Sequence, residues 1–173
     1  GVVDGSLPLL RGPPTLSPST TTTQPLNYAT LLPEGLALKP FQTVGVAYAT
    51  VRRRTFIADE MGLGKTWQAL LTLEANKAFP AVVVCPTSLR GNWEREIKAL
   101  LPHRTVALVY GNKPYDVDAD IVVVGESVLK SWADILAQPV ALILDESHYF
   151  KNEKAQRTAA AQALADSVPA EGF

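Results

Sequence analysis

The sequence lacks the features that mark secreted and membrane-spanning proteins. Cys85 is the only cysteine in 173 residues, which excludes an internal disulfide and favours a reducing compartment. No apolar run approaches the roughly 20 residues that a helix needs to cross a bilayer. The chain does not open with the basic and then apolar stretches of a secretory signal. We therefore expect an intracellular protein without membrane contact, cytoplasmic in a bacterium or phage and nuclear in a eukaryote.

An excess of charge of one sign is also missing. The chain has 16 Lys and Arg against 17 Asp and Glu, a net charge of −1, which excludes a polybasic nucleic-acid binder. The one basic run is Arg52-Arg53-Arg54. We interpret it as a solvated helix C-terminus that the helix dipole stabilises. The alternative is a contact to DNA or to phosphate.

Composition divides the chain near residue 37. Residues 1–37 are rich in proline and threonine and have no periodic apolar face, which is typical of an extended arm or linker. Four leucines in this segment could still pack on the rest of the chain: Leu9, Leu10, Leu16 and Leu31. Residues 38–173 are predicted to form one domain, because a chain with 47% hydrophobic residues can bury a single sizeable core.

Short apolar runs alternate with helical patterns along this domain. The predicted strands are residues 55–58, 81–85, 105–110, 121–124 and 140–144, and the predicted helices are residues 40–52, 65–78, 88–101, 129–136 and 153–167. Such alternation is typical of βαβ units. It predicts an α/β fold, in which helices cover both faces of a parallel sheet. Ligands of such sheets bind at the carboxyl ends of the strands.

Two predicted helices have a definable apolar face. In the helix that begins at Pro40, the residues predicted to face the core are Phe41, Val44, Gly45, Tyr48 and Ala49. Ser88 is predicted to cap a later helix, whose apolar stripe consists of Leu89, Trp93, Ile97, Leu100 and Leu101. We assign Trp93 to the core, with base stacking as the alternative.

A glycine-containing loop follows the first predicted strand. It reads Met61-Gly62-Leu63-Gly64-Lys65-Thr66 and leads into a helix, the context that a phosphate-binding loop requires. Glycines let the backbone direct successive N–H groups at one anion, and the helix N-terminus adds partial positive charge. Lys65 would reach the β- and γ-phosphates of ATP, and the Thr66 hydroxyl would ligate Mg²⁺. The alternative is an ordinary turn whose lysine faces solvent, and Asp59 stands where the strict pattern has glycine.

A second chemical signal follows the last predicted strand. The apolar run 140–144 ends in Asp145 and Glu146, and two carboxylates at the end of a buried strand are costly unless they meet a cation. Asp145 is therefore predicted to hold Mg²⁺, and Glu146 to polarise the attacking water; Glu146 and Lys65 are the predicted catalytic residues. The alternative is that Asp145 caps the following helix.

These motifs together resemble a known family. Asp-Glu-Met-Gly-Leu-Gly-Lys-Thr, ending at Thr66, and Asp-Glu-Ser-His, ending at His148, are similar to motifs of the first RecA-like lobe of SWI/SNF-type translocases in helicase superfamily two. The Asp-Glu-Ser-His form is similar to the branch of annealing helicases and of bacterial or phage relatives. Residues 38–46 resemble the family's Q motif, and residues 83–89, followed by Trp93, resemble its DNA-contacting turn. The resemblance covers residues 38–163.

The resemblance implies a role for each matching residue. Gln42 would read the adenine edge, and Ser147 with His148 would relay the nucleotide state to the rest of the protein. The residues that would touch the DNA backbone are Pro86, Thr87 and Ser88. Such contacts carry no sequence information, and from this lobe alone they would be weak and salt-sensitive. Where relatives often have tyrosine, this chain has Gly125-Glu126-Ser127, which is a departure from the pattern.

The resemblance also implies partners that the sequence does not contain. The family's Gly-Thr-Pro motif and its second RecA-like lobe are missing after Asp-Glu-Ser-His, so we expect this chain to be part of a longer protein. The intact protein would use ATP and Mg²⁺ to move along double-stranded DNA. Two other interpretations stay open: a nucleotide-type fold that serves only as a scaffold for protein partners, and a restriction-type translocase of the same superfamily.

Overall fold

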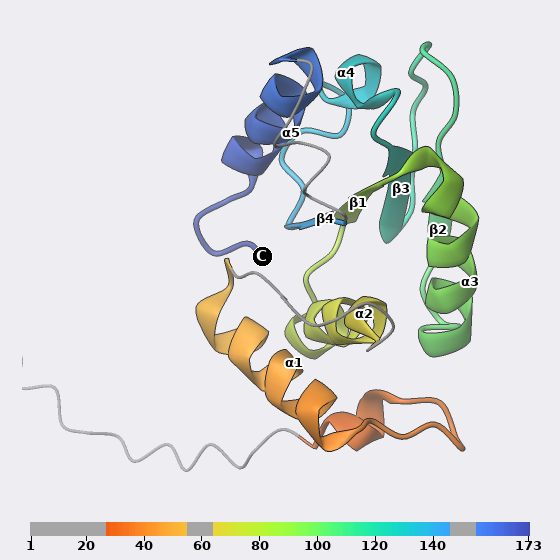
Figure 1. The fold of residues 1–173 in the computed structure, drawn as a ribbon, viewed down its shortest axis with the longest axis vertical. Coiled ribbons are helices and arrows are strands. Elements are labelled where there is room, and N and C mark those ends of the chain that lie inside the picture. Colours follow the sequence, from red (N-terminus) through yellow and green to blue (C-terminus); the bar gives the residue numbers. More distant parts are fainter. Residues whose placement is uncertain (1–26, 55–63, 146–154) are drawn as a thin grey trace, which may run out of the picture.

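A parallel sheet of four strands forms the centre of the computed structural model, which describes residues 27–54, 64–145 and 155–173 (Figure 1). The order across the sheet is β2 (Val106–Leu108), β3 (Ile121–Gly125), β1 (Ala81–Cys85) and β4 (Ala141–Leu144). In the register, Val83 of β1 lies opposite Val123 of β3 and Ile143 of β4. The four predicted strands that lie in the described residues are thereby confirmed, and the fifth, residues 55–58, lies outside them.

The two inner strands explain why the sheet is covered on both faces. Every residue of β1 and β3 is buried, as expected for the unbroken apolar runs of a parallel sheet. Their side chains alternate between two hydrophobic clusters. Ala81, Val83 and Cys85 belong to one cluster, and Val82 and Val84 belong to the other.

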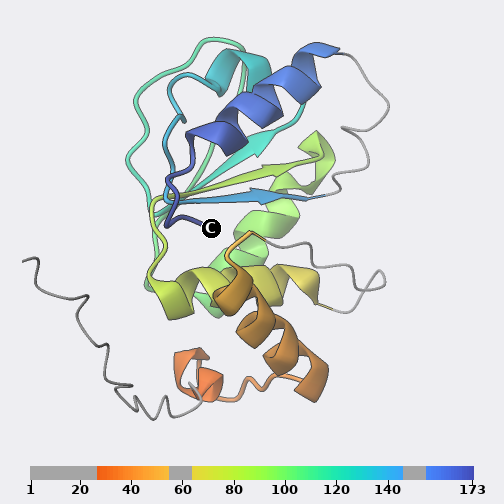
Figure 2. The ribbon, with the colours of Figure 1, turned by 90° about the vertical axis from the view of Figure 1, so that its left-hand side faces the viewer.

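Helices form a layer on each side of this sheet (Figure 2). α2 (Lys65–Asn76) and α3 (Arg90–Leu100) cover one face, while α4 (Leu129–Trp132) and α5 (Ala155–Ser167) cover the other. α1 (Pro40–Arg52) packs against α2 on the outer side of its layer. The α4 helix is shorter than the predicted 129–136: it ends at Trp132, and residues 133–136 form turns.

The predicted inner face of α1 is partly wrong. Phe41, Val44 and Tyr48 are exposed, whereas Gln42, Val46 and Ala49 are buried. The reason is the close crossing of α1 and α2: a side chain at Gly45 would collide with Gln68 of α2. The buried side of α1 therefore carries Gln42, Val46 and Ala49, and the exposed side carries Phe41, Val44 and Tyr48.

The helix after β1 also begins differently from the prediction. Residues Thr87–Leu89 form a 3-10 turn, η2, and α3 starts at Arg90 without any side-chain cap bond, so Ser88 does not cap it. The 3-10 turn comes first because the Leu89 N–H already donates to the Pro86 carbonyl. The predicted stripe of α3 is confirmed in its main part, and Trp93 lies in the core with 4% of its surface exposed.

Part of the segment predicted as an arm packs on the domain. A 3-10 turn, η1 (Tyr28–Leu31), precedes α1, and its Asn27 side chain accepts a hydrogen bond from the Ala29 N–H. Tyr28 is buried, and Leu31 is among the residues that pack against the cluster beneath α2. Among the described residues, no helix is long and apolar enough to pass through a membrane.

The basic run at the end of α1 contacts the C-terminal segment. Arg53 donates to the Glu171 carbonyl and lies over the Phe173 ring, with 5.5 Å between the guanidinium carbon and the ring centroid. Arg54 donates to the Val168 carbonyl at 3.4 Å. All three arginines stay exposed at the helix C-terminus, as predicted, but two of them also hold residues 168–173 in place.

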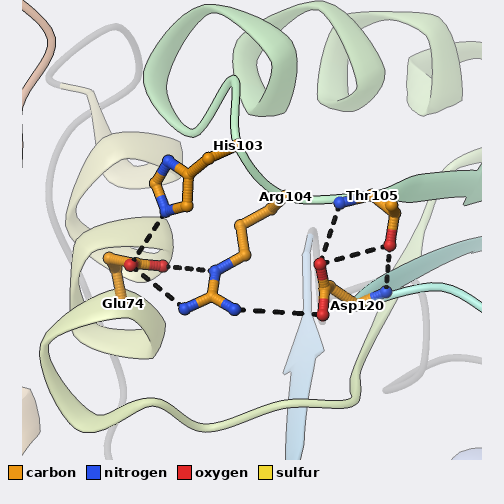
Figure 3. Close-up of polar contacts among 5 residues, drawn as sticks. All are labelled: Glu74, His103, Arg104, Thr105 and Asp120. Carbon is orange, nitrogen blue, oxygen red and sulfur yellow. Dashed lines mark hydrogen bonds and ion pairs between the residues drawn. The ribbon is translucent and has the colours of Figure 1, made fainter.

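A cluster of charged side chains lies at the amino edge of the sheet and connects α2 with the segments before β2 and β3 (Figure 3). Glu74 of α2 accepts two hydrogen bonds from Arg104, at 2.8 and 3.1 Å, and one contact from His103 at 3.0 Å. Arg104 also lies 3.9 Å from Asp120, and Asp120 accepts the Thr105 N–H at 2.9 Å. The cluster ties α2 to the segments that enter β2 and β3.

Candidate nucleotide site

The predicted site residues that the structure describes gather at the carboxyl edge of the sheet. All strand pairs are parallel, so their carboxyl ends share one edge. The turn at residues 86–88 follows β1 there, and Asp145 follows β4. The N-terminus of α2, with Lys65 and Thr66, meets the same edge, because Thr66 and Asp145 line one pocket.

Gly64 sets the start of α2. Its φ of 72° and ψ of 38° lie in the left-handed region that glycine adopts without strain. The Gly64 carbonyl accepts the Gln68 N–H at 3.2 Å, so Lys65 is the first residue of the helix and Thr66 the second. The first N–H groups of a helix have no partner within it and carry the positive end of its dipole. This end of α2 suits an anion.

Gln42 lies against this loop. A side chain at Gly64 would collide with the Gln42 amide nitrogen, so the two residues are in close approach. Gln42 is 6% exposed, and its Oε1 accepts the Lys39 N–H at 2.9 Å as part of a cap on α1. The structure thus places Gln42 beside the start of α2, and its predicted contact with adenine stays a prediction.

A pocket of about 210 Å³ joins α2, α3 and β4. Its lining residues are Thr66, Leu89, Asn92, Trp93, Arg95, Glu96 and Asp145. Thr66 and Asp145, the two predicted metal ligands, therefore face one space although 79 positions separate them in the chain. Both offer oxygen atoms, the donors that Mg²⁺ prefers.

Two indole–carboxylate bonds surround this pocket. Trp93 of α3 donates its Nε1–H to Asp145 Oδ2 at 2.8 Å. Trp67 of α2 donates its Nε1–H to Glu96 Oε2 of α3 at 2.7 Å. The backbone of Asp145 is fixed separately, because its N–H donates to the Val84 carbonyl at 2.8 Å. Sequence reasoning missed Trp67 and Glu96, because their bond joins two different helices and depends on how those helices pack.

The predicted DNA-contacting turn packs against its neighbour. The Thr87 hydroxyl lies 2.7 Å from the Ser127 hydroxyl and 3.4 Å from a Glu126 carboxylate oxygen. The Glu126 N–H donates to the Cys85 carbonyl at 3.0 Å, which ties the two strand ends together. Ser88 is exposed and Pro86 is half-buried. A carboxylate beside Thr87 weakens any attraction of this turn for a phosphate.

Burial and nearby charge act together on the one cysteine. Cys85 is 1% exposed at the end of β1. Its burial, and then the negative charges of Asp145 and Glu126, raise the pKa of the thiol to about 12. The thiol stays protonated at neutral pH and packs as a small apolar group, as predicted.

Several predicted site residues lie outside the described part of the chain. These are Met61, Gly62, Leu63, Glu146, Ser147 and His148. Within residues 27–54, 64–145 and 155–173, no group of three or more His, Cys, Asp or Glu side chains forms a metal site. The predicted Mg²⁺ ligands Thr66 and Asp145 therefore stay a prediction, and proteins commonly hold Mg²⁺ through one or two carboxylates together with substrate phosphates.

Comparison with known proteins decides the family. Residues 41–168 match the SNF2-related domain. The chain belongs to the SNF2-related family. The predicted resemblance to SWI/SNF-type ATPases of helicase superfamily two is thereby confirmed.

Curated relatives of this SNF2-related domain are much longer proteins. It is 38% identical over 138 residues to the Drosophila melanogaster SWI/SNF-related matrix-associated actin-dependent regulator of chromatin subfamily A-like protein 1, covering 76% of this chain and 18% of that protein. It is 35% identical over 156 residues to human DNA annealing helicase and endonuclease ZRANB3, covering 81% of this chain and 14% of that protein. The chain thus spans less than one fifth of either relative.

Solved structures agree with the fold. The SNF2-related domain is similar to the Sulfolobus solfataricus SWI2/SNF2 ATPase core in complex with double-stranded DNA, with a TM-score of 0.66 and 27% identity. That likeness covers 75% of this chain and 30% of the other. The predicted RecA-like α/β fold, a parallel sheet between two helical layers, is confirmed.

Proposed function

We propose that this SNF2-related domain binds Mg·ATP and, in the intact protein, couples ATP hydrolysis to movement along double-stranded DNA. The observation that carries the proposal is the shared pocket of Thr66 and Asp145 at the carboxyl edge of the sheet. That edge is where open α/β sheets bind ligands. Membership of the SNF2-related family supports the same use of the site.

The described residues fit a magnesium nucleotide. Thr66 supplies a hydroxyl and Asp145 a carboxylate, and α2 directs its positive end to the same place. Lys65 follows Gly64, whose backbone is left-handed, and a glycine directly before the lysine is part of the sequence pattern of a phosphate-binding loop. In this proposal, Met61, Gly62, Leu63, Gly64, Lys65 and Thr66 hold the phosphates and Gln42 contacts the base.

The chain's own residues divide the work of hydrolysis. Bound Mg·ATP supplies an activated γ-phosphoryl group. Lys65 balances its negative charge, Asp145 and Thr66 hold the metal, and Glu146 orients and deprotonates the attacking water. His148, next to this site in sequence, relays the nucleotide state to the second lobe.

DNA is the proposed polymer substrate, with this domain contributing weakly. The solved SWI2/SNF2 core is in complex with double-stranded DNA, and the human relative is named a DNA annealing helicase. Pro86, Thr87 and Ser88 would contact phosphates, but the nearby Glu126 carboxylate opposes them. The second lobe would supply most of the affinity for DNA. It would also supply the arginines that reach the γ-phosphate.

We expect residues 1–173 alone to catalyse hydrolysis poorly, because this proposal assigns the arginines that reach the γ-phosphate to a second lobe. An arginine finger contributes about 10³ to 10⁵ in kcat, which is about 4 to 7 kcal/mol at 1.36 kcal/mol per decade. We therefore expect nucleotide binding but almost no turnover from residues 1–173. A rate near about 1 per second with duplex DNA, typical of a working enzyme, would contradict the need for a second lobe.

The first prediction concerns Lys65. Lys65→Ala should weaken Mg·ATP binding at least about tenfold, or about 1.4 kcal/mol, because it removes the positive charge beside the phosphates. Isothermal calorimetry with the 173-residue chain measures this. Lys98→Ala is the matched control, since Lys98 is an exposed lysine on α3 that pairs only with Glu94 among the described residues. Its affinity should equal that of the unmodified chain.

Two results would count against the proposal. Equal affinity in Lys65→Ala and the unmodified chain would remove Lys65 from the phosphate site. A folded chain that binds no Mg·ATP at all would favour the scaffold interpretation, in which the fold serves protein partners instead.

A further inference from the structure

Hydrogen bonds to α3 are made by one predicted metal ligand, Asp145, and by the residue that follows the other. Asp145, directly after β4, accepts a hydrogen bond from Trp93 of α3 at 2.8 Å. Thr66 of α2 is followed by Trp67, whose indole donates to Glu96 of α3 at 2.7 Å. Trp93 and Glu96 are three residues apart on α3 and therefore lie on one side of it. Both bonds border the pocket that Thr66 and Asp145 line.

Both contacts have the geometry of strong hydrogen bonds. Distances of 2.7 to 2.8 Å lie in the range of charge-assisted N–H···O⁻ bonds. The Trp93 indole is almost fully buried, at 4% exposure, so water has little access to its N–H group and competes little with Asp145 as its acceptor. It donates to Oδ2 of Asp145, so this bond leaves the lone pairs of Oδ1 to other partners such as a metal.

The third tryptophan shows that a buried indole does not need a carboxylate. Trp132 of α4, which is fully buried, donates to the Gly111 carbonyl at 2.8 Å on the other face of the sheet. A backbone carbonyl therefore satisfies an indole in this same fold. At the pocket, two indoles use acidic side chains instead, and each bond crosses between two different elements.

From this arrangement we propose that Trp67, Trp93 and Glu96 form a bracket that sets the spacing of Thr66 and Asp145 for the metal. The bracket rests on the proposed function, because it assigns Mg²⁺ to those two residues. Both bonds are anchored on α3. The Trp67–Glu96 bond fixes the start of α2, and the Trp93–Asp145 bond fixes the rotamer of Asp145. In this proposal the three bracket residues act on the metal only through Thr66 and Asp145, as positioning residues.

The bracket also connects the metal site to the turn after β1. α3 begins at Arg90, directly after the η2 turn, and Trp93 is only one helical turn further along. Leu89 at the end of η2 lines the same pocket as Asp145. A displacement of the turn at residues 86–89 would therefore move the indole that orients the carboxylate. The metal site is thus mechanically joined to the segment where DNA contact is proposed.

The test measures how much Mg²⁺ strengthens nucleotide binding. The probe is ADP, titrated by calorimetry into the 173-residue chain with Mg²⁺ and with EDTA. Trp93→Phe keeps an aromatic ring in the core but removes the N–H donor. We expect the apparent Mg²⁺ affinity to fall about 10- to 100-fold, the usual loss when a partner of a metal ligand is removed. ADP binding in EDTA should not change.

Matched variants separate positioning from packing. Trp132→Phe also removes a buried indole donor, but its acceptor is a carbonyl far from the pocket, so the Mg²⁺ effect should stay as in the unmodified chain. Glu96→Gln keeps an oxygen acceptor for Trp67 and should retain most of the Mg²⁺ effect, whereas Glu96→Leu should lose it. Circular dichroism and thermal unfolding establish that each variant is folded.

The outcomes distinguish the bracket from the proposed function. If the unmodified chain binds ADP equally with and without Mg²⁺, both the metal site and the bracket are refuted. If Mg²⁺ strengthens binding in the unmodified chain and equally in folded Trp93→Phe, the bracket is refuted and the metal site stands. Should Trp93→Phe not fold, Glu96→Leu decides: a reduced Mg²⁺ effect supports the bracket, and an unchanged one overturns it.

Discussion

At the scale of single residues, Cys85 illustrates how a strand end controls reactivity. The thiolate is the nucleophilic form of cysteine, and burial, followed by the charges of Asp145 and Glu126, raises the pKa of this thiol to about 12. At pH 8 the thiolate fraction is then about 10⁻⁴, against about one tenth for an ordinary thiol with a pKa near 9. Cys85 is therefore inert although it borders a chemical site.

This predicts slow alkylation of the folded chain. At pH 8, iodoacetamide should modify Cys85 at least about 100-fold more slowly in buffer than in urea, because unfolding restores both access and an ordinary pKa. Mass spectrometry of quenched time points measures the rates. Labelling at similar rates in both conditions would show that Cys85 is neither buried nor shifted in pKa.

The sequence predicts some residues of the candidate site and misses others. Thr66 and Asp145 could be predicted to meet, because each follows from a rule about parallel sheets and phosphate loops. Trp67 and Glu96 could not, since their bond depends on how α2 and α3 pack together. A motif reports which residue types a ligand needs, whereas the residues that hold them in place are set by tertiary packing.

At the scale of elements, the same contrast separates strands from helices. The inner strands β1 and β3 could be read from unbroken apolar runs, because both of their faces are buried. The orientation of α1 could not, because the close approach at Gly45 turns Phe41, Val44 and Tyr48 outward. Periodicity finds a helix reliably, but the partner helix decides which side is buried.

Replacing glycine by alanine should have opposite effects on stability at Gly91 and at Gly125, because only Gly125 is closely packed against another element. Gly91→Ala should stabilise the chain by about 0.5 to 1 kcal/mol, since alanine favours α3 and nothing lies within 4 Å of the added carbon. Gly125→Ala should destabilise it by about 1 to 3 kcal/mol, since the added carbon would lie 3.3 Å from the Thr87 Cα and 2.7 Å from its hydroxyl.

Thermal unfolding measures both effects. For a chain of this length, 1 kcal/mol corresponds to about 2 to 4 °C in Tm. Gly91→Ala should therefore unfold at a slightly higher temperature than the unmodified chain, and Gly125→Ala at a lower one. A raised Tm for Gly125→Ala would show that the ends of β1 and β3 are not packed as closely as described.

At the scale of the whole molecule, the cluster at the amino edge contributes to stability against acid. Burial alone would raise the pKa of Glu74, but hydrogen bonds and positive charge from Arg104 and His103 outweigh it, and the net pKa is lowered from 4.5. A lowered carboxyl pKa stabilises the fold above the unfolded value and loses that contribution as pH falls through the folded value. Asp120 shares the same arginine.

The lowered pKa of Glu74 leads to a prediction about the pH dependence of stability. Arg104→Ala should reduce the free energy of unfolding by about 1 to 3 kcal/mol at pH 7. The difference from the unmodified chain should shrink below about pH 4.5, where Glu74 begins to be protonated in the unfolded state. Urea unfolding at pH 7 and pH 3.5 measures it. Lys98→Ala, which removes an exposed pair with Glu94, should cost at most about 0.5 kcal/mol at either pH.

The position of that ionic cluster has a consequence for how the molecule can diverge. Glu74, Arg104 and Asp120 lie where the chain enters β2 and β3, whereas Thr66 and Asp145 line a pocket at the opposite edge of the sheet. Substitutions that tune the stability of this fold can therefore accumulate at the amino edge of the sheet while leaving the candidate nucleotide site at the opposite edge unchanged.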